Sequence, residues 1–253
     1  MVPSWNGFYV GANAGAGWGE SKFGSITNVP LFPSFGIPTS TGTTTVPESN
    51  GNVASTKGND VNAIGGGQFG LNWQRGNFVF GAEADYDGSA IRSDAIGPAT
   101  ATGTTATLHN AAQIVRAHYF TKMDWLGSVR ARIGFVQDWL MVYATGGFAL
   151  GHAGVQTSFV EVNSPVIIPS GAVSILTVKD SALHTGWTAG AGAEWRINRR
   201  WSLGVEYRYS DYGPQTYDAG IAHADFASSP RLSTKMRLTA DQVTLRLNIH
   251  LGA

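Results

Sequence analysis

The feature that most constrains the fold of this chain is a strict alternation of apolar and polar residues near its C-terminus. In the segment 243–251, VTLRLNIHL, aliphatic residues occupy every second position and polar residues such as Arg246 lie between them. The segment 201–209, WSLGVEYRY, places Glu206 and Arg208 between apolar residues in the same way. Successive side chains of a β-strand point to opposite faces, so both segments are predicted to be strands with one apolar face.

Six further segments fit the same pattern with varying clarity. Each has about 10 residues or more, the length that a tilted strand needs to cross the hydrocarbon of a bilayer, whereas strands of soluble proteins have about 5–6 residues. No apolar run approaches the ~18 residues of a membrane-spanning helix. The six segments are 7–18, 61–73, 78–91, 125–135, 139–155 and 186–197.

The connections between these segments alternate in length. Four long and three short connections are the asymmetry expected of outer-membrane barrels. We therefore predict an all-β fold, an eight-stranded antiparallel up-and-down transmembrane β-barrel with four long loops on one rim, as a single domain of residues 1–253. The short connections are 74–77, 136–138 and 198–200, and the long ones are 19–60, 92–124, 156–185 and 213–241.

Charged residues make up only 13% of the chain, and the alternation assigns most strand charges to one face. A charge that faces the middle of a bilayer costs about 2–4 kcal/mol, so we expect the charges inside the barrel, as a salt-bridged network. Glycines at inward positions are expected to leave room for the arginines. The predicted network is Glu83, Asp85, Asp87, Arg130, Arg132, Glu194, Arg196, Glu206, Arg208 and Arg246, and the inward glycines are Gly11, Gly15, Gly70, Gly134, Gly190, Gly192 and Gly204.

Aromatic residues gather at the predicted strand ends. Outer-membrane barrels carry girdles of aromatic side chains at both membrane interfaces, and this is the position that we expect here. The predicted girdle residues are Trp5, Trp18, Trp73, Phe78, Trp125, Trp139, Trp187, Trp195 and Trp201.

A soluble, lipocalin-like barrel is the main alternative fold. Its interior would be apolar and its charged residues would face water. The aromatic-rich apolar face and the scarcity of charge favour the membrane barrel.

Several function classes find no support in the sequence. The 17 basic and 17 acidic residues balance, which argues against a nucleic-acid partner. There is no cysteine and no recognised catalytic motif, and the acid pair Glu83 and Asp85 is expected to be structural. We therefore expect no enzyme activity and no cofactor or metal. The histidines in or near the long loops, for which haem or metal ligation is a weaker alternative, are His109, His118, His152, His184 and His223.

At this point the sequence resembles the small OmpA-like outer-membrane barrels, and among them the "porin family" surface antigens of Gram-negative bacteria. The resemblance lies in the predicted strands and leaves the four long loops unmatched. It is carried by WNGFYVGANAGAGWG (5–19), GGGQFGLNWQ (65–74), FVFGAEADYDGS (78–89), WLGSVRARIGF (125–135), YATGGFALG (143–151), GWTAGAGAEWRI (186–197) and LGVEYRYSDYG (203–213).

The resemblance implies a barrel inserted by the outer-membrane assembly machinery, which in this family reads a C-terminal strand that ends in Phe. This chain has Leu251 at that place, followed by Gly252 and Ala253. The first four residues lack the charge and apolar core of a signal peptide, so the sequence is expected to be a mature form in the bacterial outer membrane.

The leading functional prediction is a structural surface protein with a side-chain-filled barrel and contact-making extracellular loops. The alternatives are a narrow channel for small solutes or ions, and surface capture of haem or another ligand. Besides lipid, the expected partners are a second copy or neighbouring envelope proteins, bound through loop aromatics. Several of these aromatics are expected to pack the loops onto one another instead of binding a partner. They are Phe23, Phe32, Phe35, Phe159, Tyr217 and Phe226.

Overall fold

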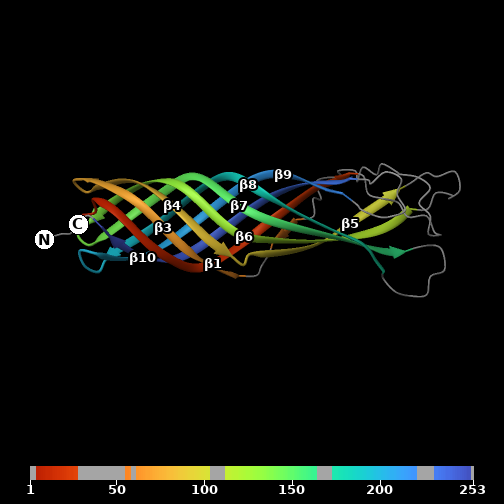
Figure 1. Cartoon of the computed structure of the whole chain (residues 1–253), viewed down its shortest axis with the longest axis horizontal. Coiled ribbons are helices and arrows are strands. Elements are labelled where there is room, and N and C mark those ends of the chain that lie inside the picture. The colour runs from red at the N-terminus through yellow and green to blue at the C-terminus, as the bar shows by residue number, and fades with distance from the viewer. Residues whose placement is uncertain are drawn as a thin grey trace.

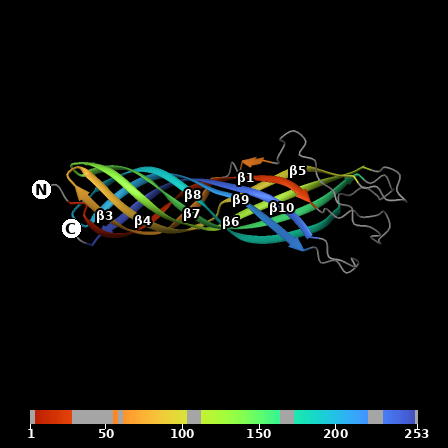
Figure 2. The same cartoon turned by 90° about the horizontal axis from the view of Figure 1, so that it is seen from above.

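The fold is a closed, elongated barrel of antiparallel strands, as the computed structural model shows (Figures 1 and 2). The structure describes residues 4–27, 55–57, 61–102, 112–163, 173–220 and 231–251. Within these ranges the strands are β1 (Gly7–Thr27), β2 (Ser55–Lys57), β3 (Asn62–Arg75), β4 (Phe78–Ser89), β5 (Arg92–Thr102), β6 (Ala112–Gln137), β7 (Leu140–Asn163), β8 (Val173–Arg196), β9 (Trp201–Gly220) and β10 (Arg231–His250).

Eight of the described strands form the ring, in the order β1, β3, β4, β6, β7, β8, β9 and β10, and the ring closes where β10 pairs with β1. Tyr9 lies opposite His250 in that closing ladder. The short strands β2 and β5 add to β1 and β6 outside the ring order. The predicted eight-stranded barrel is therefore confirmed.

Three tight turns join neighbouring strands at one end of the barrel, here called the turn end, where both chain termini also lie (Figures 1 and 2). Gly76 and Asp138 supply the positive φ angles, 61° and 54°, that two of the turns require. In the third, the Asn198 side chain accepts hydrogen bonds from the backbone N–H groups of Arg200 and Trp201 at 2.8 and 2.9 Å. The remaining connections leave at the opposite end, called the loop end.

The burial pattern places the apolar face of the strands outside the barrel. On β10, Leu245 is 63% exposed and the neighbouring Arg246 is 3% exposed. Leu247, Val205 and Tyr207 also face outward, whereas the side chains of Glu206 and Arg208 are buried in the interior. The soluble, lipocalin-like alternative is therefore wrong, because its leucines would be inside. No helix among the described residues is long and apolar enough to span a bilayer.

The strands extend much further toward the loop end than the sequence predicts. Residues 19–27, 112–124, 173–185, 213–220 and 231–241 were predicted to be loop and are strand. The ladder between β6 and β7 reaches Ile114 and Asn163. The barrel wall therefore continues well beyond the part that carries the apolar belt.

Candidate functional site

The centre of the barrel interior holds a ring of four charged side chains from four strands. Arg130 on β6 donates to Glu83 on β4 at 2.5 Å and to Glu206 on β9 at 2.6 Å. Arg246 on β10 bridges the same two carboxylates, with 2.5 Å to Glu83. All four side chains are at most 3% exposed. Each guanidinium thus joins both carboxylates across the lumen, and the charges cancel within the ring.

A second cluster lies next to this ring on the loop side. Arg208 donates to Asp85 at 2.7 Å and to Asp87 at 2.8 Å, and Arg130 also reaches Asp85 at 3.0 Å. Asn13 donates to Asp87 at 2.8 Å. The two aspartates are therefore held by shared arginines and by neutral donors.

A third cluster lies on the turn side of the ring, around Glu194. This carboxylate pairs with Arg132, accepts a hydrogen bond from Ser202 at 2.5 Å and another from Asn248 at 2.9 Å. His250 lies 3.6 Å away. Nine of the ten predicted network residues are thus brought together in the interior.

Arg196 is the exception to the predicted network. It is buried, but it donates to the backbone oxygens of Arg199 and Ser4 at 2.6 and 2.5 Å, and among the described residues it forms no ion pair with a carboxylate. Its guanidinium lies 4.8 Å from the ring centre of Trp5. Trp5 is fully buried, so its assignment to the outer girdle is wrong. The two residues close the turn end because residues 4–6 fold back over the lumen.

Two tyrosines complete the network, and sequence reasoning missed them. Tyr9 donates to Glu83 at 2.5 Å, and Tyr143 donates to Glu206 at 3.0 Å. Each tyrosine lies opposite a glycine on the neighbouring strand, Tyr9 opposite Gly70 and Tyr143 opposite Gly192. A Cβ at Gly192 would lie 2.6 Å from the Tyr143 ring. These inward glycines therefore make room for tyrosine rings, not for the arginines that we expected. The sequence signal that could have identified these tyrosines is an inward-facing Tyr opposite a Gly on the neighbouring strand.

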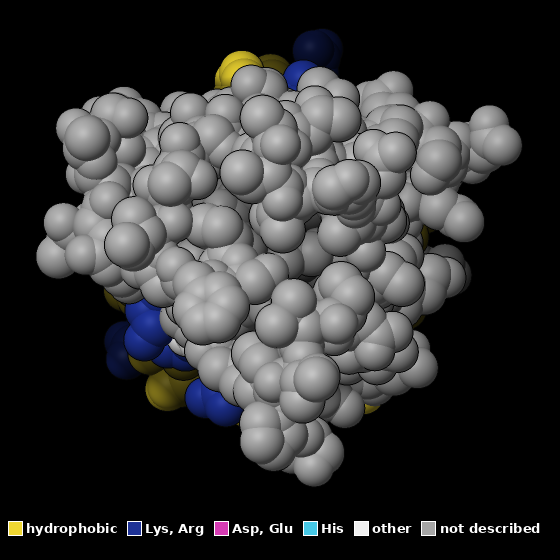
Figure 3. Space-filling model, turned by 90° about the vertical axis from the view of Figure 1, so that its right-hand side faces the viewer, with side chains coloured by type: hydrophobic (Ala, Val, Ile, Leu, Met, Phe, Trp, Pro, Cys, Tyr) yellow, Lys and Arg dark blue, Asp and Glu magenta, His cyan; other side chains and the backbone are white. Residues whose placement is uncertain are grey.

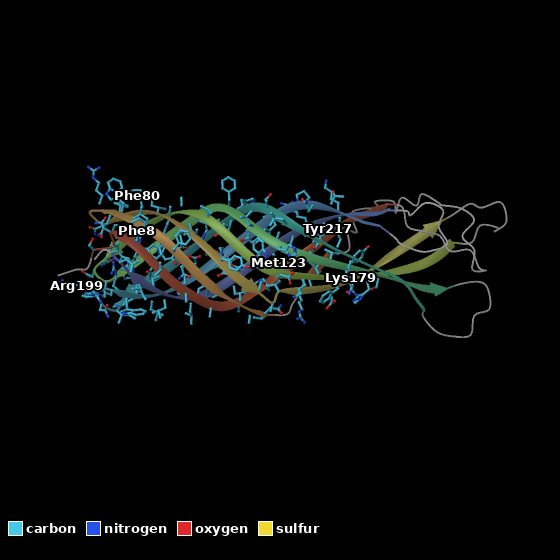
Figure 4. All side chains as sticks on the ribbon, in the orientation of Figure 1. Phe8, Phe80, Met123, Lys179, Arg199 and Tyr217 are labelled. Atoms are coloured by element: carbon cyan, nitrogen blue, oxygen red, sulfur yellow. The ribbon has the colours of Figure 1, made fainter. Side chains whose placement is uncertain are left out.

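Apolar layers cover the charged clusters at both ends. Toward the loop end, the layer contains Ile64, Ile91, Met123, Leu126, Ala149, Ala153, Tyr212, Leu238 and Ala240 (Met123 is labelled in Figure 4). Toward the turn end, it contains Trp5, Val79, Val136, Met141 and Tyr143. The charged interior is consequently separated from water on both sides by packed side chains.

The other predicted girdle residues lie on the outer face in two bands. The band toward the loop end contains Trp18, Trp125 and Trp187, and the band toward the turn end contains Trp73, Phe78, Trp139, Trp195 and Trp201. Phe78 and Tyr86 lie about eight residues apart on β4, which at ~3.3 Å per residue and a tilt of about 40° separates them by about 20 Å along the barrel axis. This height is close to the apolar band of ~25 Å in outer-membrane barrels, so the interfacial role remains our prediction for these residues.

The described histidines do not gather into a ligand set. His118 lies 3.8 Å from Asp94 and His152 lies 3.2 Å from Asp124. His184 is buried against the Tyr217 hydroxyl at 2.5 Å, and this burial lowers its pKa. Among the described residues, no three His, Cys, Asp or Glu side chains could hold a metal ion together. His109 and His223 lie outside the described residues.

Ser202, His250 and Glu194 contact one another, but their geometry differs from that of a hydrolytic triad. Ser202 lies 2.9 Å from Nε2 of His250, and Glu194 approaches the same Nε2 atom. A triad needs the acid on the other ring nitrogen, Nδ1, to orient the base. All three residues are also buried, so a substrate has no access to the serine.

The predicted loop aromatics are placed only in part. Tyr217 belongs to β9 and is buried, so it is not a loop contact. Phe23 lies on β1 and Phe159 on β7. Phe32, Phe35 and Phe226 lie outside the described residues.

Comparisons with known proteins agree with this architecture. Residues 3–229 match the family model described as "Outer membrane protein beta-barrel domain". The chain is 35% identical over 215 residues to the 31 kDa outer-membrane immunogenic protein of Brucella melitensis biotype 1, which covers 83% of this chain and 72% of that protein. It is 29% identical over 166 residues to the 22 kDa outer membrane protein of Rhizobium leguminosarum bv. viciae, covering 64% of this chain and 59% of that protein.

Among solved structures, the chain aligns with the outer membrane protein OprG from Pseudomonas aeruginosa. The TM-score is 0.44 at 8% identity, and the alignment covers 98% of this chain and 99% of that one.

Proposed function

The chain belongs to the outer membrane protein beta-barrel domain family and lies in the bacterial outer membrane, and from this premise we propose that it is a non-enzymatic structural protein of that membrane. In this proposal the barrel passes no solute. The parts that function are the strand ends and the loops outside the lipid. The long loops of such barrels are extracellular and the short turns periplasmic, so the loop end faces the medium.

The observation that carries this proposal is that side chains fill the lumen, with the charged clusters in the centre and an apolar layer at each end. The ring of Glu83, Arg130, Glu206 and Arg246 joins four strands across the interior. A barrel of eight strands is just wide enough for its own side chains. Breaking a buried ion pair leaves an uncompensated charge at a cost of about 3–5 kcal/mol. Opening a path through the ring would require several such breaks, and the apolar layers would still block the path.

Planar-bilayer recording tests the proposal. The wild-type barrel should insert without unitary conductance. A positive control replaces Glu83, Arg130, Glu206 and Arg246 with Ala, which removes the ring, together with Met123→Ala and Trp5→Ala, which thin the two apolar layers. This variant should conduct if its heat-dependent gel mobility shows that it is folded.

If it does not fold, the Met123→Ala and Trp5→Ala pair with the ring intact serves as a second variant and should remain silent. Reproducible unitary steps from the wild-type protein would overturn the proposal in favour of a narrow channel.

We also propose that the extracellular part mediates contact with a second copy or with neighbouring envelope proteins. The support is the length of the strands outside the apolar belt, because a wall of this height places residues well above the lipid. Sizing in mild detergent should find dimers or larger assemblies. A monomer at every protein concentration would contradict self-association.

A further inference from the structure

Three cations occupy adjoining outward positions on β1 and β10, just beyond the loop-side aromatic band. Lys22 lies directly opposite Arg237 in the ladder between these strands. Lys235 lies two residues from Arg237 and is also exposed. The side chains of Lys22 and Arg237 are 54% and 55% exposed. Seen from the loop end, Lys and Arg side chains are visible at the margin of the molecule (Figure 3). We call Lys22, Lys235 and Arg237 the basic triad.

This arrangement is unfavourable for the barrel by itself. Like charges directly opposite each other on neighbouring strands destabilise a sheet. The acids nearby neutralise it only in part, since Glu20 lies 3.6 Å from Lys22 and Asp211 pairs with Arg237. For Lys235 no carboxylate partner is found among the described contacts. An anion placed between the three cations would relieve the repulsion.

A cation elsewhere at the same level shows the contrast. Lys122 on β6 lies 2.6 Å from Asp124, and Asp124 also contacts His152 at 3.2 Å. That side of the barrel therefore supplies a carboxylate next to its lysine. Among the described residues, the three cations of the basic triad have Glu20 and Asp211 as their carboxylate neighbours, which leaves a surplus of positive charge.

The height of the triad indicates where its anion comes from. Lys22 follows Trp18 by about four residues, which at ~3.3 Å per residue and a tilt of about 40° places it about 10 Å further along the barrel axis. Interfacial aromatic residues mark the level of the lipid headgroups, and each headgroup layer is about 5–8 Å thick. The triad thus lies at the outer edge of the outer-leaflet headgroups.

We propose that the basic triad binds the phosphate groups of the glycolipid that forms the outer leaflet of this membrane. The phosphates supply the missing negative charge, and the acyl chains of the same lipid lie against the apolar belt below. The Arg237 guanidinium donates to phosphate oxygens, a geometry to which arginine is suited, while the two lysine ammonium groups act as point charges. The partner is a sugar-borne phosphate anchored in the leaflet, not a soluble anion.

Titration of the refolded full chain in zwitterionic detergent with lipid A, followed by native mass spectrometry, tests this site. A cation near an anionic headgroup contributes about five-fold in affinity. Replacing all three members of the triad with Gln should therefore weaken lipid A binding on the order of 100-fold. The pair Lys22→Gln and Lys235→Gln keeps the Arg237–Asp211 contact and should cost roughly 25-fold. This pair preserves a test if the triple variant does not fold.

The matched control is Lys122→Gln, which removes an exposed lysine at the same level and should leave lipid A binding unchanged. Dephosphorylated lipid A should bind the wild-type chain as weakly as it binds the triple variant. Equal binding of lipid A by the folded triple variant and the wild type would overturn the proposal. So would equal affinity for an anionic phospholipid, or displacement of lipid A by an equal concentration of inorganic phosphate.

Discussion

Glu83 accepts hydrogen bonds from three side chains that come from three strands. The donors are Tyr9, Arg130 and Arg246, each at 2.5 Å. Glu83→Gln keeps the shape of the side chain but removes the negative charge that two guanidinium groups share. We expect the free energy of unfolding to fall by about 3 kcal/mol or more, because the charge left behind is buried. Urea unfolding of the protein in phospholipid vesicles measures this loss.

Asp94→Asn is the control for the Glu83→Gln prediction. The Asp94 side chain is 60% exposed and lies 3.8 Å from His118, and an exposed ion pair contributes about 0–1 kcal/mol. A Glu83→Gln loss no larger than that of Asp94→Asn would show that the central ring does not hold the barrel together.

Among single elements, β6 is interrupted by a register shift between Met123 and Trp125 in its ladder with β7. Asp124 lies at this shift, where it contacts Lys122 on its own strand and His152 on β7. The hydrogen bond from Lys122 is the largest cause that lowers the pKa of Asp124, and the bond from His152 adds to it. The Asp124 carboxylate therefore links β6 to β7 through His152 at the point where the regular strand pairing is interrupted.

The lowered pKa of Asp124 sets the sign of a pH dependence. Since the folded pKa lies below the unfolded value of about 3.9, the stabilisation is present above that value and is lost as the pH falls toward the folded pKa. The thermal midpoint of Asp124→Asn should therefore lie below that of the wild type at pH 6, and the two should converge near pH 3. A difference that stays constant between these pH values would contradict this role.

The strands were predicted well where lipid contacts them and poorly beyond it. In the membrane-spanning part of β10, Leu245 faces hydrocarbon and Arg246 faces the lumen, so the alternation is strong. Toward the loop end, Lys22 faces outward beside the buried Ser21, and both are polar. The contrast between faces disappears there because polar headgroups and water replace hydrocarbon on the outside, and a polar strand then cannot be distinguished from a loop.

The charged site was predictable in its membership but not in its pairing. Inward positions follow from alternation, whereas the partner of each arginine depends on strand stagger and on the turn end. Arg196 lies on the inward face, as predicted, but the chain before β1 folds over it and offers backbone oxygens. The tyrosine contributions were missed because the predicted network was assembled from charged residues alone.

At the scale of the whole molecule, the barrel depends on the pairing of its first and last ring strands. Ala14 on β1 lies opposite Leu245 on β10, and both face outward. The chain has no cysteine, so Ala14→Cys with Leu245→Cys gives a single candidate disulfide between Cβ atoms about 4.5–5.5 Å apart. We expect mild oxidation to link them in the folded barrel, which a gel-mobility shift after boiling detects.

The matched pair Ala14→Cys with Leu203→Cys places the second thiol on β9, which does not pair with β1. This pair should stay reduced under the same conditions. Linkage of both pairs at equal rates would mean that the ring is not closed in the observed register.

The strands that extend beyond the lipid determine which epitopes antibodies can recognise on this protein. Residues of β1 and β10 that lie side by side there are separated by most of the sequence, and they become neighbours only when the barrel closes. A serum raised against boiled protein would therefore see linear peptides, while a serum raised against intact bacteria would see a composite epitope that heating in detergent abolishes.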